Sequence, residues 1–264
     1  MKATLLIKNI ENLYTCDKEF QILSRAYIAI HHDKIIDVGI GSYSQWIDSA
    51  TRVIDAVGEI VLPGFIDASF TGFAKVRLGD QLRENSTALF AMRQNGILTL
   101  LTKDPKIQRK ELSQDVFIQK KEASYPILQR EAQYKHKKPS KFLLSCGFGL
   151  PNSYVYSFQP LCYALFNTHH VDKRTLLESM TSLPAACFDL NDRGSIQKGM
   201  LADLLILQVP TIEHYFQTLG RPLIHRMIKK RNSVLSGMDG LLRVYEKFSE
   251  KCLTFFHWIG IIYP

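Results

Sequence analysis

The chain has 264 residues, of which 46% are hydrophobic and 22% are charged. This is the composition of a globular protein with a core, and it excludes a disordered chain and a long coiled coil. The net charge is +8, but the basic residues are scattered and are not interleaved with aromatic residues. We therefore expect no nucleic-acid partner.

The first sixty residues favour β-structure. Short apolar or alternating runs bounded by turn residues predict strands over 4–8, 26–31, 34–39, 53–55 and 60–62. A further buried strand is predicted at 65–70, directly after the break that Pro63 and Gly64 introduce.

A strand–helix–strand unit follows. Residues 82–94 show the spacing of an amphipathic helix, Asn95 and Gly96 form a helix-stop signal, and 97–102 is an apolar run typical of a buried strand. Such a unit is the repeating element of a parallel α/β sheet. Residues 103–140 are polar and predict helix at most.

The second half of the chain mixes helices and strands and ends in β-structure. We predict strands at 141–146 and 202–209, helices at 159–166, 173–181 (capped by Asp172) and 241–251, and a hairpin over 223–229 and 233–235.

This order, β then α/β then β, predicts an α/β fold with a discontinuous domain. We expect residues 1–62 and 193–236 to form one composite β-sandwich, with residues 63–192 inserted between them as an α/β segment and residues 237–264 as a C-terminal helical and apolar tail. The apolar run at 253–264 is too short to span a bilayer, so we expect it to pack on the body and not to contact a membrane.

The five cysteines are odd in number and include no Cys-x-x-Cys pair. In a chain of this length the pattern argues against a disulfide framework and favours a reducing cytoplasm. The apolar run near the N-terminus is too short for a signal peptide.

Several stretches resemble a known family. Residues 61–67, V-L-P-G-F-I-D, resemble the L-P-G-F-I-D motif at the start of the amidohydrolase barrel. Residues 181–185, T-S-L-P-A, are similar to the T-x-N-P-A motif, and residues 192–207 resemble the D-R-G-S-I-x-x-G and A-D-L-V-V-L return to the sandwich. The chain thus resembles the amidohydrolase superfamily, which implies a β-sandwich joined to a (β/α)8 barrel.

Within that superfamily three stretches resemble imidazolonepropionase. Residues 73–77 resemble F-A-G-x-R, residues 95–103 resemble H-G-x-T-T-x-E-x-K, and residues 209–224 resemble V-P-x-Y followed by F-G-x-N-P-V. The resemblance implies hydrolysis of a cyclic amide C–N bond, the opening of an imidazolone ring in histidine degradation. It also implies that Arg77 meets the propionate carboxylate of the substrate.

The barrel region is too short for a complete barrel. A (β/α)8 barrel takes about 250 residues, or about 200 at the low end, whereas residues 65–180 must hold everything between the two barrel motifs. The matched pieces correspond to the first two strands and the last strand. We therefore expect a truncated, incomplete TIM-type barrel segment.

The metal-ligand positions of the family are also altered. The resemblance implies an H-x-H pair on the first barrel strand, where this chain has Ser69 and Thr71, and hydroxyls are poor zinc or iron ligands. The metal-binding Asp of the last strand has no counterpart, because residues 132–171 contain no acidic residue. Adjacent His31 and His32 face opposite ways on a strand, so we do not expect them to share a metal.

These observations lead to one hypothesis and two alternatives. We expect a catalytically degenerate imidazolonepropionase homologue with no catalytic residue and no cofactor, and with Arg77 as its substrate-binding candidate. The first alternative is an active hydrolase that holds zinc or iron. The second is a non-catalytic scaffold partner of an intact amidohydrolase. We expect a second copy of the chain, or an intact homologue, to cover exposed sheet edges.

Overall fold

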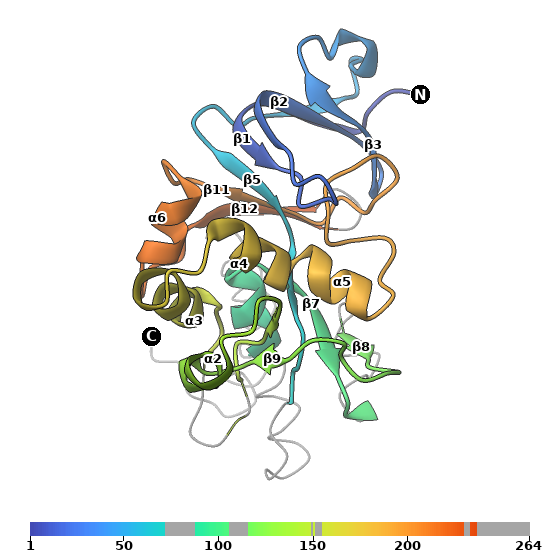
Figure 1. Ribbon diagram of the computed structural model, residues 1–264. Coiled ribbons are helices and arrows are strands. Elements are labelled where there is room, and N and C mark those ends of the chain that lie inside the picture. The colour runs from blue at the N-terminus through green and yellow to red at the C-terminus, as the bar shows by residue number, and fades with distance from the viewer. Residues whose placement is uncertain (72–87, 106–115, 149, 151–154, 230–232, 237–264) are drawn as a thin grey trace, which may run out of the picture.

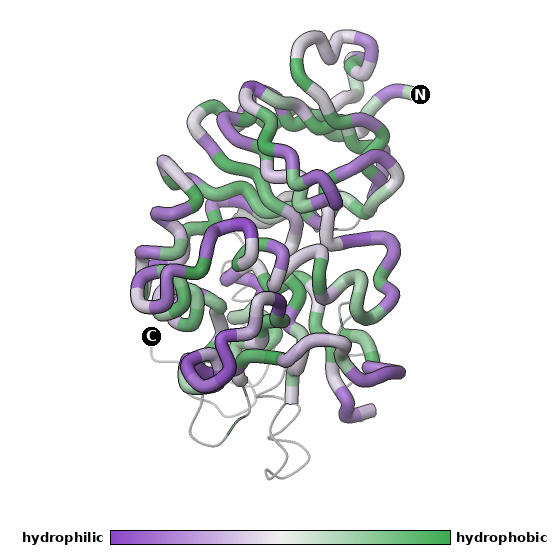
Figure 2. Tube along the Cα trace, viewed as in Figure 1, coloured by the Kyte–Doolittle hydropathy of each residue, from purple (hydrophilic) through white to green (hydrophobic). Residues whose placement is uncertain are grey.

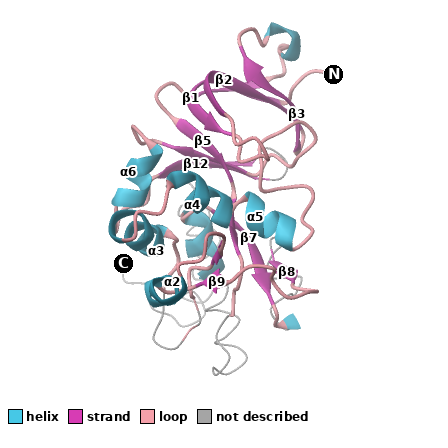
Figure 3. Ribbon diagram, viewed as in Figure 1, coloured by secondary structure: helices cyan, strands magenta, loops and turns pink. Residues whose placement is uncertain are grey.

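The computed structural model describes residues 1–71, 88–105, 116–148, 150, 155–229 and 233–236, with side chains described as far as Lys229. A large sheet forms one half of the molecule, and short strands covered by helices form the other half (Figure 1; Figure 3). Within the described ranges no helix is both long and apolar enough to cross a membrane.

The large sheet is built from both ends of the chain. Its eight strands lie in the order β13-β12-β11-β5-β1-β2-β3, with β4 paired to β1. Their bounds are β1 (Leu5–Tyr14), β2 (Ile22–His31), β3 (Lys34–Ile40), β4 (Arg52–Asp55), β5 (Ile60–Pro63), β11 (Leu204–Leu207), β12 (Ile224–Lys229) and β13 (Ser233–Ser236). Antiparallel pairing of β5 with β11, with Leu62 opposite Leu205, joins the two ends. This confirms the predicted composite β-structure.

The strands β5 and β11 separate two apolar cores, because successive side chains on a strand point to opposite faces. Val61, Leu204 and Ile206 pack with residues of β1 and β2 in a core that the sheet encloses by itself. Leu62 and Leu205 face the other way, into a core shared with the short strands and helices. Figure 2 shows the hydrophobic residues running along these central strands.

Five short strands form the remnant of the barrel: β6 (Phe65–Asp67), β7 (Ile97–Thr102), β8 (Val116–Ile118), β9 (Ile127–Leu128) and β10 (Leu143–Leu144). The first three are parallel to one another, and so are the last two. The two groups meet where Ala68 N donates to Leu144 O at 3.0 Å. These described strands form open sheets and no closed barrel, which confirms the truncated-barrel part of the fold class.

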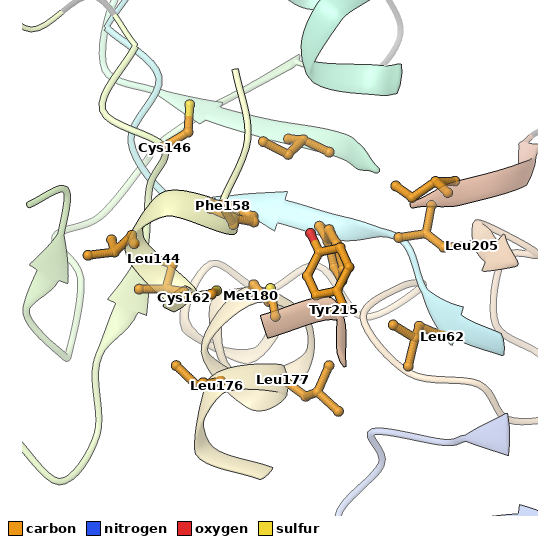
Figure 4. Close-up of a cluster of buried hydrophobic side chains, with 14 of the residues drawn as sticks. Leu62, Leu144, Cys146, Phe158, Cys162, Leu176, Leu177, Met180, Leu205 and Tyr215 are labelled. Carbon is orange, nitrogen blue, oxygen red and sulfur yellow. The ribbon is translucent and has the colours of Figure 1, made fainter. Parts of the chain in front are cut away.

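Short helices pack against these strands: α2 (Glu131–Lys137), α3 (Gln159–Tyr163), α4 (Lys173–Met180), α5 (Ser182–Cys187) and α6 (Ile212–Gln217), with a π-helical turn, η3 (Ala164–Thr168), after α3 and a 3-10 turn, η1 (Ser44–Trp46), at the sandwich. As predicted, Asp172 caps α4 by accepting from Thr175 N at 2.9 Å. Figure 4 shows Met180 of α4 and Tyr215 of α6 near Leu205 in the shared core.

The predicted helix-stop signal ends the helical residues 88–94. Gly96 has a φ of +84°, and a Cβ there would lie 2.5 Å from Ile224 Cδ1 and 2.8 Å from Leu205 Cδ1. The backbone conformation and the close contact with the sandwich both require glycine at this position.

Two expectations about secondary structure were wrong. Residues 103–140 contain the strands β8 and β9 as well as helix α2. Strands of two or three residues are too short to show a periodic pattern, which is why the sequence did not reveal them. In addition, β2 ends at His31 and His32 has a left-handed φ of +54°, so the two rings lie 4.3 Å apart and do not face opposite ways.

Some predictions fall on residues that the structure does not describe. Arg77, the helix at 241–251 and the tail at 237–264 lie outside the described residues. The domain boundaries, which place 1–62 with 193–236 and separate 63–192, stay predictions.

Candidate active site

The candidate site lies where the ends of β6 and β10 meet, because active-site residues of α/β barrels stand at the carboxyl ends of the strands. Asp67, the last residue of β6, is fully buried. Its Oδ1 accepts from Ser69 N at 2.9 Å and its Oδ2 accepts from Cys146 N at 2.8 Å. Burial raises the pKa of Asp67, and these hydrogen bonds oppose the rise. Asp67 therefore fastens the first barrel strand to the segment after β10.

The two hydroxyl residues considered in the sequence analysis, Ser69 and Thr71, follow directly after this strand. Thr71 Oγ1 donates to Phe148 O at 2.8 Å. The carbonyl oxygen of Ser69 accepts from Ser145 Oγ at 3.1 Å and from Gln129 Nε2 at 3.5 Å. The segment 69–71 is thus bound to residues that follow β9 and β10.

The donors that surround this segment are neutral. Gln119, just after β8, donates from Nε2 to Ala68 O at 2.5 Å. Together with Gln129 and Ser145 it brings three neutral donors from three strand ends to the backbone after β6. Sequence reasoning missed these residues, because each lies 51 to 76 positions from its partner and no local pattern marks it.

Aromatic side chains fill the space beside the strand ends. The rings of Phe70 and Phe148 stack with 5.6 Å between centroids and 8° between planes, and both side chains are buried. The ring of Tyr156 lies 5.2 Å from that of Phe148. Apolar packing therefore closes the described part of this region.

These residues do not fit a zinc or iron ion. Across the described ranges, no group of three or more His, Cys, Asp or Glu side chains could hold a metal. The Cys146 thiol adjoins Asp67, but burial, followed by the charge of Asp67, raises its pKa well above the ordinary value. Both oxygens of Asp67 already accept backbone N–H groups, and Asp67 with Cys146 supplies two possible ligands where zinc takes at least three from the protein.

Two further residues with chemistry of interest make other contacts. Lys103, in the stretch 95–103, forms an exposed ion pair with Glu122 at 2.8 Å. His169 Nε2 lies 2.9 Å from Glu131 Oε1. Neither contact involves the ends of β6 and β10.

Comparison with known proteins agrees with this fold. No family model matches the chain. A Xaa-Pro dipeptidase with bound methionine superposes with a TM-score of 0.66 and 12% identity, covering 88% of this chain and 99% of that chain. A prolidase complexed with N-methylphosphonate-L-proline gives 0.61 and 11%, covering 88% and 99%. A mutant atrazine chlorohydrolase from Arthrobacter aurescens TC1, complexed with zinc and atraton, gives 0.60 and 12%, covering 88% and 95%.

These structural neighbours are members of the amidohydrolase superfamily, so the chain has an amidohydrolase-like fold with an open barrel remnant. The sequence itself is similar to imidazolonepropionase from Caldanaerobacter subterraneus subsp. tengcongensis, at 42% identity over 77 residues. That match covers 25% of this chain and spans only 18% of the length of the relative.

Proposed function

We propose that this chain is a catalytically degenerate homologue of imidazolonepropionase that hydrolyses no cyclic amide by itself. The observation that carries the proposal is the hydrogen bonding of Asp67. Both of its carboxylate oxygens accept backbone N–H groups, and the side chain is fully buried. The carboxylate is used to hold β6 against the segment after β10.

Imidazolone opening needs an activated water, a base that takes its proton and a cation that polarises the carbonyl oxygen. Among the described residues at the strand ends, Ser69, Thr71, Gln119, Gln129 and Ser145 are neutral. The hydroxyl of Thr71 and the amide of Gln119 also hold backbone oxygens. This set supports a structural role for the former catalytic end of the strands.

The decisive experiment measures metal content and turnover on the same preparation. We expect the purified chain, dialysed against zinc and then against buffer, to hold far less than about one equivalent of metal by mass spectrometry. We also expect no turnover of imidazolone propionate. Imidazolonepropionase from Caldanaerobacter subterraneus is the positive control. One equivalent of zinc or iron, with turnover abolished by a chelator, would favour the active-hydrolase alternative.

We also propose that a second copy of the chain, or an intact homologue, binds this protein in the cytoplasm. The support is that within the described residues β8 and β9 each pair with one strand only, and unpaired strand edges favour association. Light scattering after size exclusion, with and without an added intact amidohydrolase, tests this. A strictly monomeric chain that ignores the homologue would contradict the proposal.

A further inference from the structure

A cleft of about 990 Å³ is lined by none of the polar residues described at the ends of β6 and β10, although its wall includes Tyr156, whose ring lies 5.2 Å from that of Phe148. It is bordered by the end of the helical residues 88–94, by the segment 155–160 that leads into α3, and by the start of β12. Its size is within the range of small-molecule sites. The cleft is independent of the proposed loss of hydrolysis, so either conclusion can fail without the other.

The cleft contains a histidine held by a buried carboxylate. Nδ1 of His225 is bonded to Oε1 of Glu59, whose side chain is only 6% exposed. A carboxylate accepts only, so Nδ1 carries the proton in this bond. Nε2 is then the nitrogen that can contact a ligand. It accepts in the neutral ring, and it donates to an anion only in the imidazolium form, in which both ring nitrogens carry a hydrogen. Arg226 supports the same carboxylate at 3.7 Å.

A second basic side chain borders the same cleft. Arg221 is exposed, and within the described part of the chain no hydrogen bond or ion pair is made by its guanidinium group. Its backbone is fixed, since Gln159 Nε2 donates to Arg221 O at 3.1 Å. No acidic residue is among those that line the cleft. The lining therefore favours an anionic ligand group, for which arginine is well suited.

The remaining lining divides into an apolar part and amides. Val155, Pro160 and Leu223 supply apolar surface, whereas Gln94 and Gln208 supply side-chain amides. An apolar wall with a few convergent polar groups is typical of small-molecule sites. We propose that this cleft binds a small organic carboxylate with an apolar body, whose carboxylate contacts Arg221 and His225.

The test uses octanoate as the probe and octanamide as its neutral match, titrated into the full chain by calorimetry. We expect octanoate to bind and octanamide to bind about tenfold more weakly, because a charge-assisted hydrogen bond contributes about 1.5–3 kcal/mol and 1.4 kcal/mol is tenfold. Arg221→Gln and His225→Gln should each weaken octanoate binding by a similar factor. The control variant Arg52→Gln, on exposed β4 of the sandwich, should leave binding unchanged.

Any of three results with the full-length chain would overturn the proposal. They are no octanoate binding, equal affinity for octanoate and octanamide, and unchanged binding in Arg221→Gln. If His225→Gln unfolds the chain because Glu59 is left buried without its partner, the result for Arg221→Gln remains decisive. Strand β13 pairs with β12 so that Ser236 lies opposite Arg226, and the chain therefore leaves β13 beside His225. Octanoate binding seen only after deletion of residues 253–264 would assign the cleft to the chain's own tail and would also contradict the proposal.

Discussion

At the scale of single residues, Asp67 is a buried carboxylate held by one local and one distant hydrogen bond. A strand was predicted over 65–70, and the structure has it over Phe65–Asp67, so that it ends in this carboxylate. The bond from Ser69 N spans two residues and is local, whereas the bond from Cys146 N spans 79. Local sequence could indicate the first bond but not the second, because only the packing of β6 beside β10 brings Cys146 to it.

The burial of Asp67 gives a pH-dependent prediction. Its pKa is raised above 3.8 in the folded protein, so the folded state holds this proton more tightly than the unfolded state does. As pH rises from about 4 to 7, the wild type loses stability relative to Asp67→Asn, which does not titrate. Urea unfolding at several pH values measures this difference. Asp67→Asn also loses a hydrogen bond, which lowers its free energy of unfolding by about 1–3 kcal/mol at every pH.

Asp55→Asn is the matched control for this measurement. The pKa of the exposed Asp55 is lowered, chiefly by the hydrogen bond from Asn9. Its stabilising contribution is therefore present above pH 3.8 and is lost as pH falls, which is the opposite sign. Identical pH dependence in the two variants would contradict the burial of an ionisable Asp67.

Thr71 gives a second residue-scale prediction. Thr71→Val keeps the β-branched shape but removes the donor that binds Phe148 O at 2.8 Å. We expect a loss of about 1 kcal/mol in the free energy of unfolding, since one net hydrogen bond is removed. Chemical denaturation measures it, with Ser42→Ala as an exposed control. An unchanged unfolding midpoint would mean that Thr71 does not tie β6 to the segment after β10.

At the scale of elements, predictability followed length and periodicity. The run 97–102 was correctly predicted as a strand. All six of its residues are buried in the structure, and a strand that is buried on both faces shows in the sequence as an apolar run. The strands β8 and β9 were missed because they are two or three residues long. They are strands because they pair with β7 and β10, and no local sequence pattern shows that pairing. Gly96 was predicted as a stop signal, but its contact with β11 and β12 was not, because those strands lie more than one hundred positions away.

Gly96 and Gly58 form a matched pair for testing that contact. Both have positive φ, at +84° and +70°, but a Cβ at Gly58 meets nothing within 4 Å. Gly58→Ala should cost about 1 kcal/mol from backbone strain alone. Gly96→Ala should cost about 1–3 kcal/mol more, because its methyl group overpacks Ile224 and Leu205. Thermal melts of both variants measure the difference. An equal loss of stability in the two variants would mean that packing does not require glycine at position 96.

At the scale of the whole molecule, the motif spacing predicted both the composite sheet and the missing barrel. Matching motifs at residues 61–67 and 192–207 implied that the chain's two ends share one sheet, and the pairing of β5 with β11 bears this out. The sequence did not predict how the strands of the open barrel remnant are held together. That depends on Phe70, Phe148 and the neutral donors, whose contacts join strands that are adjacent only after folding.

This packing of the strand ends gives the last prediction, the failure of a ligand-restoring variant. In the double variant Ser69→His and Thr71→His, the imidazoles replace two small hydroxyl residues next to the stacked rings of Phe70 and Phe148. The second substitution also removes the bond to Phe148 O. Asp67 lies in the same segment, but both of its oxygens are bound to backbone N–H groups, one of them that of Cys146.

We therefore expect the double variant to hold no stoichiometric zinc after dialysis, to show no imidazolone propionate turnover, and to lose at least about 1 kcal/mol of stability through the missing hydrogen bond. Thr71→Val isolates the cost of that bond, so any further loss of stability in the double variant measures the effect of introducing the two imidazoles. Zinc bound at one equivalent, with turnover that a chelator removes, would show that two histidines are enough to restore the site. The neutral strand ends would then be a recent loss of two ligands in an otherwise competent barrel end.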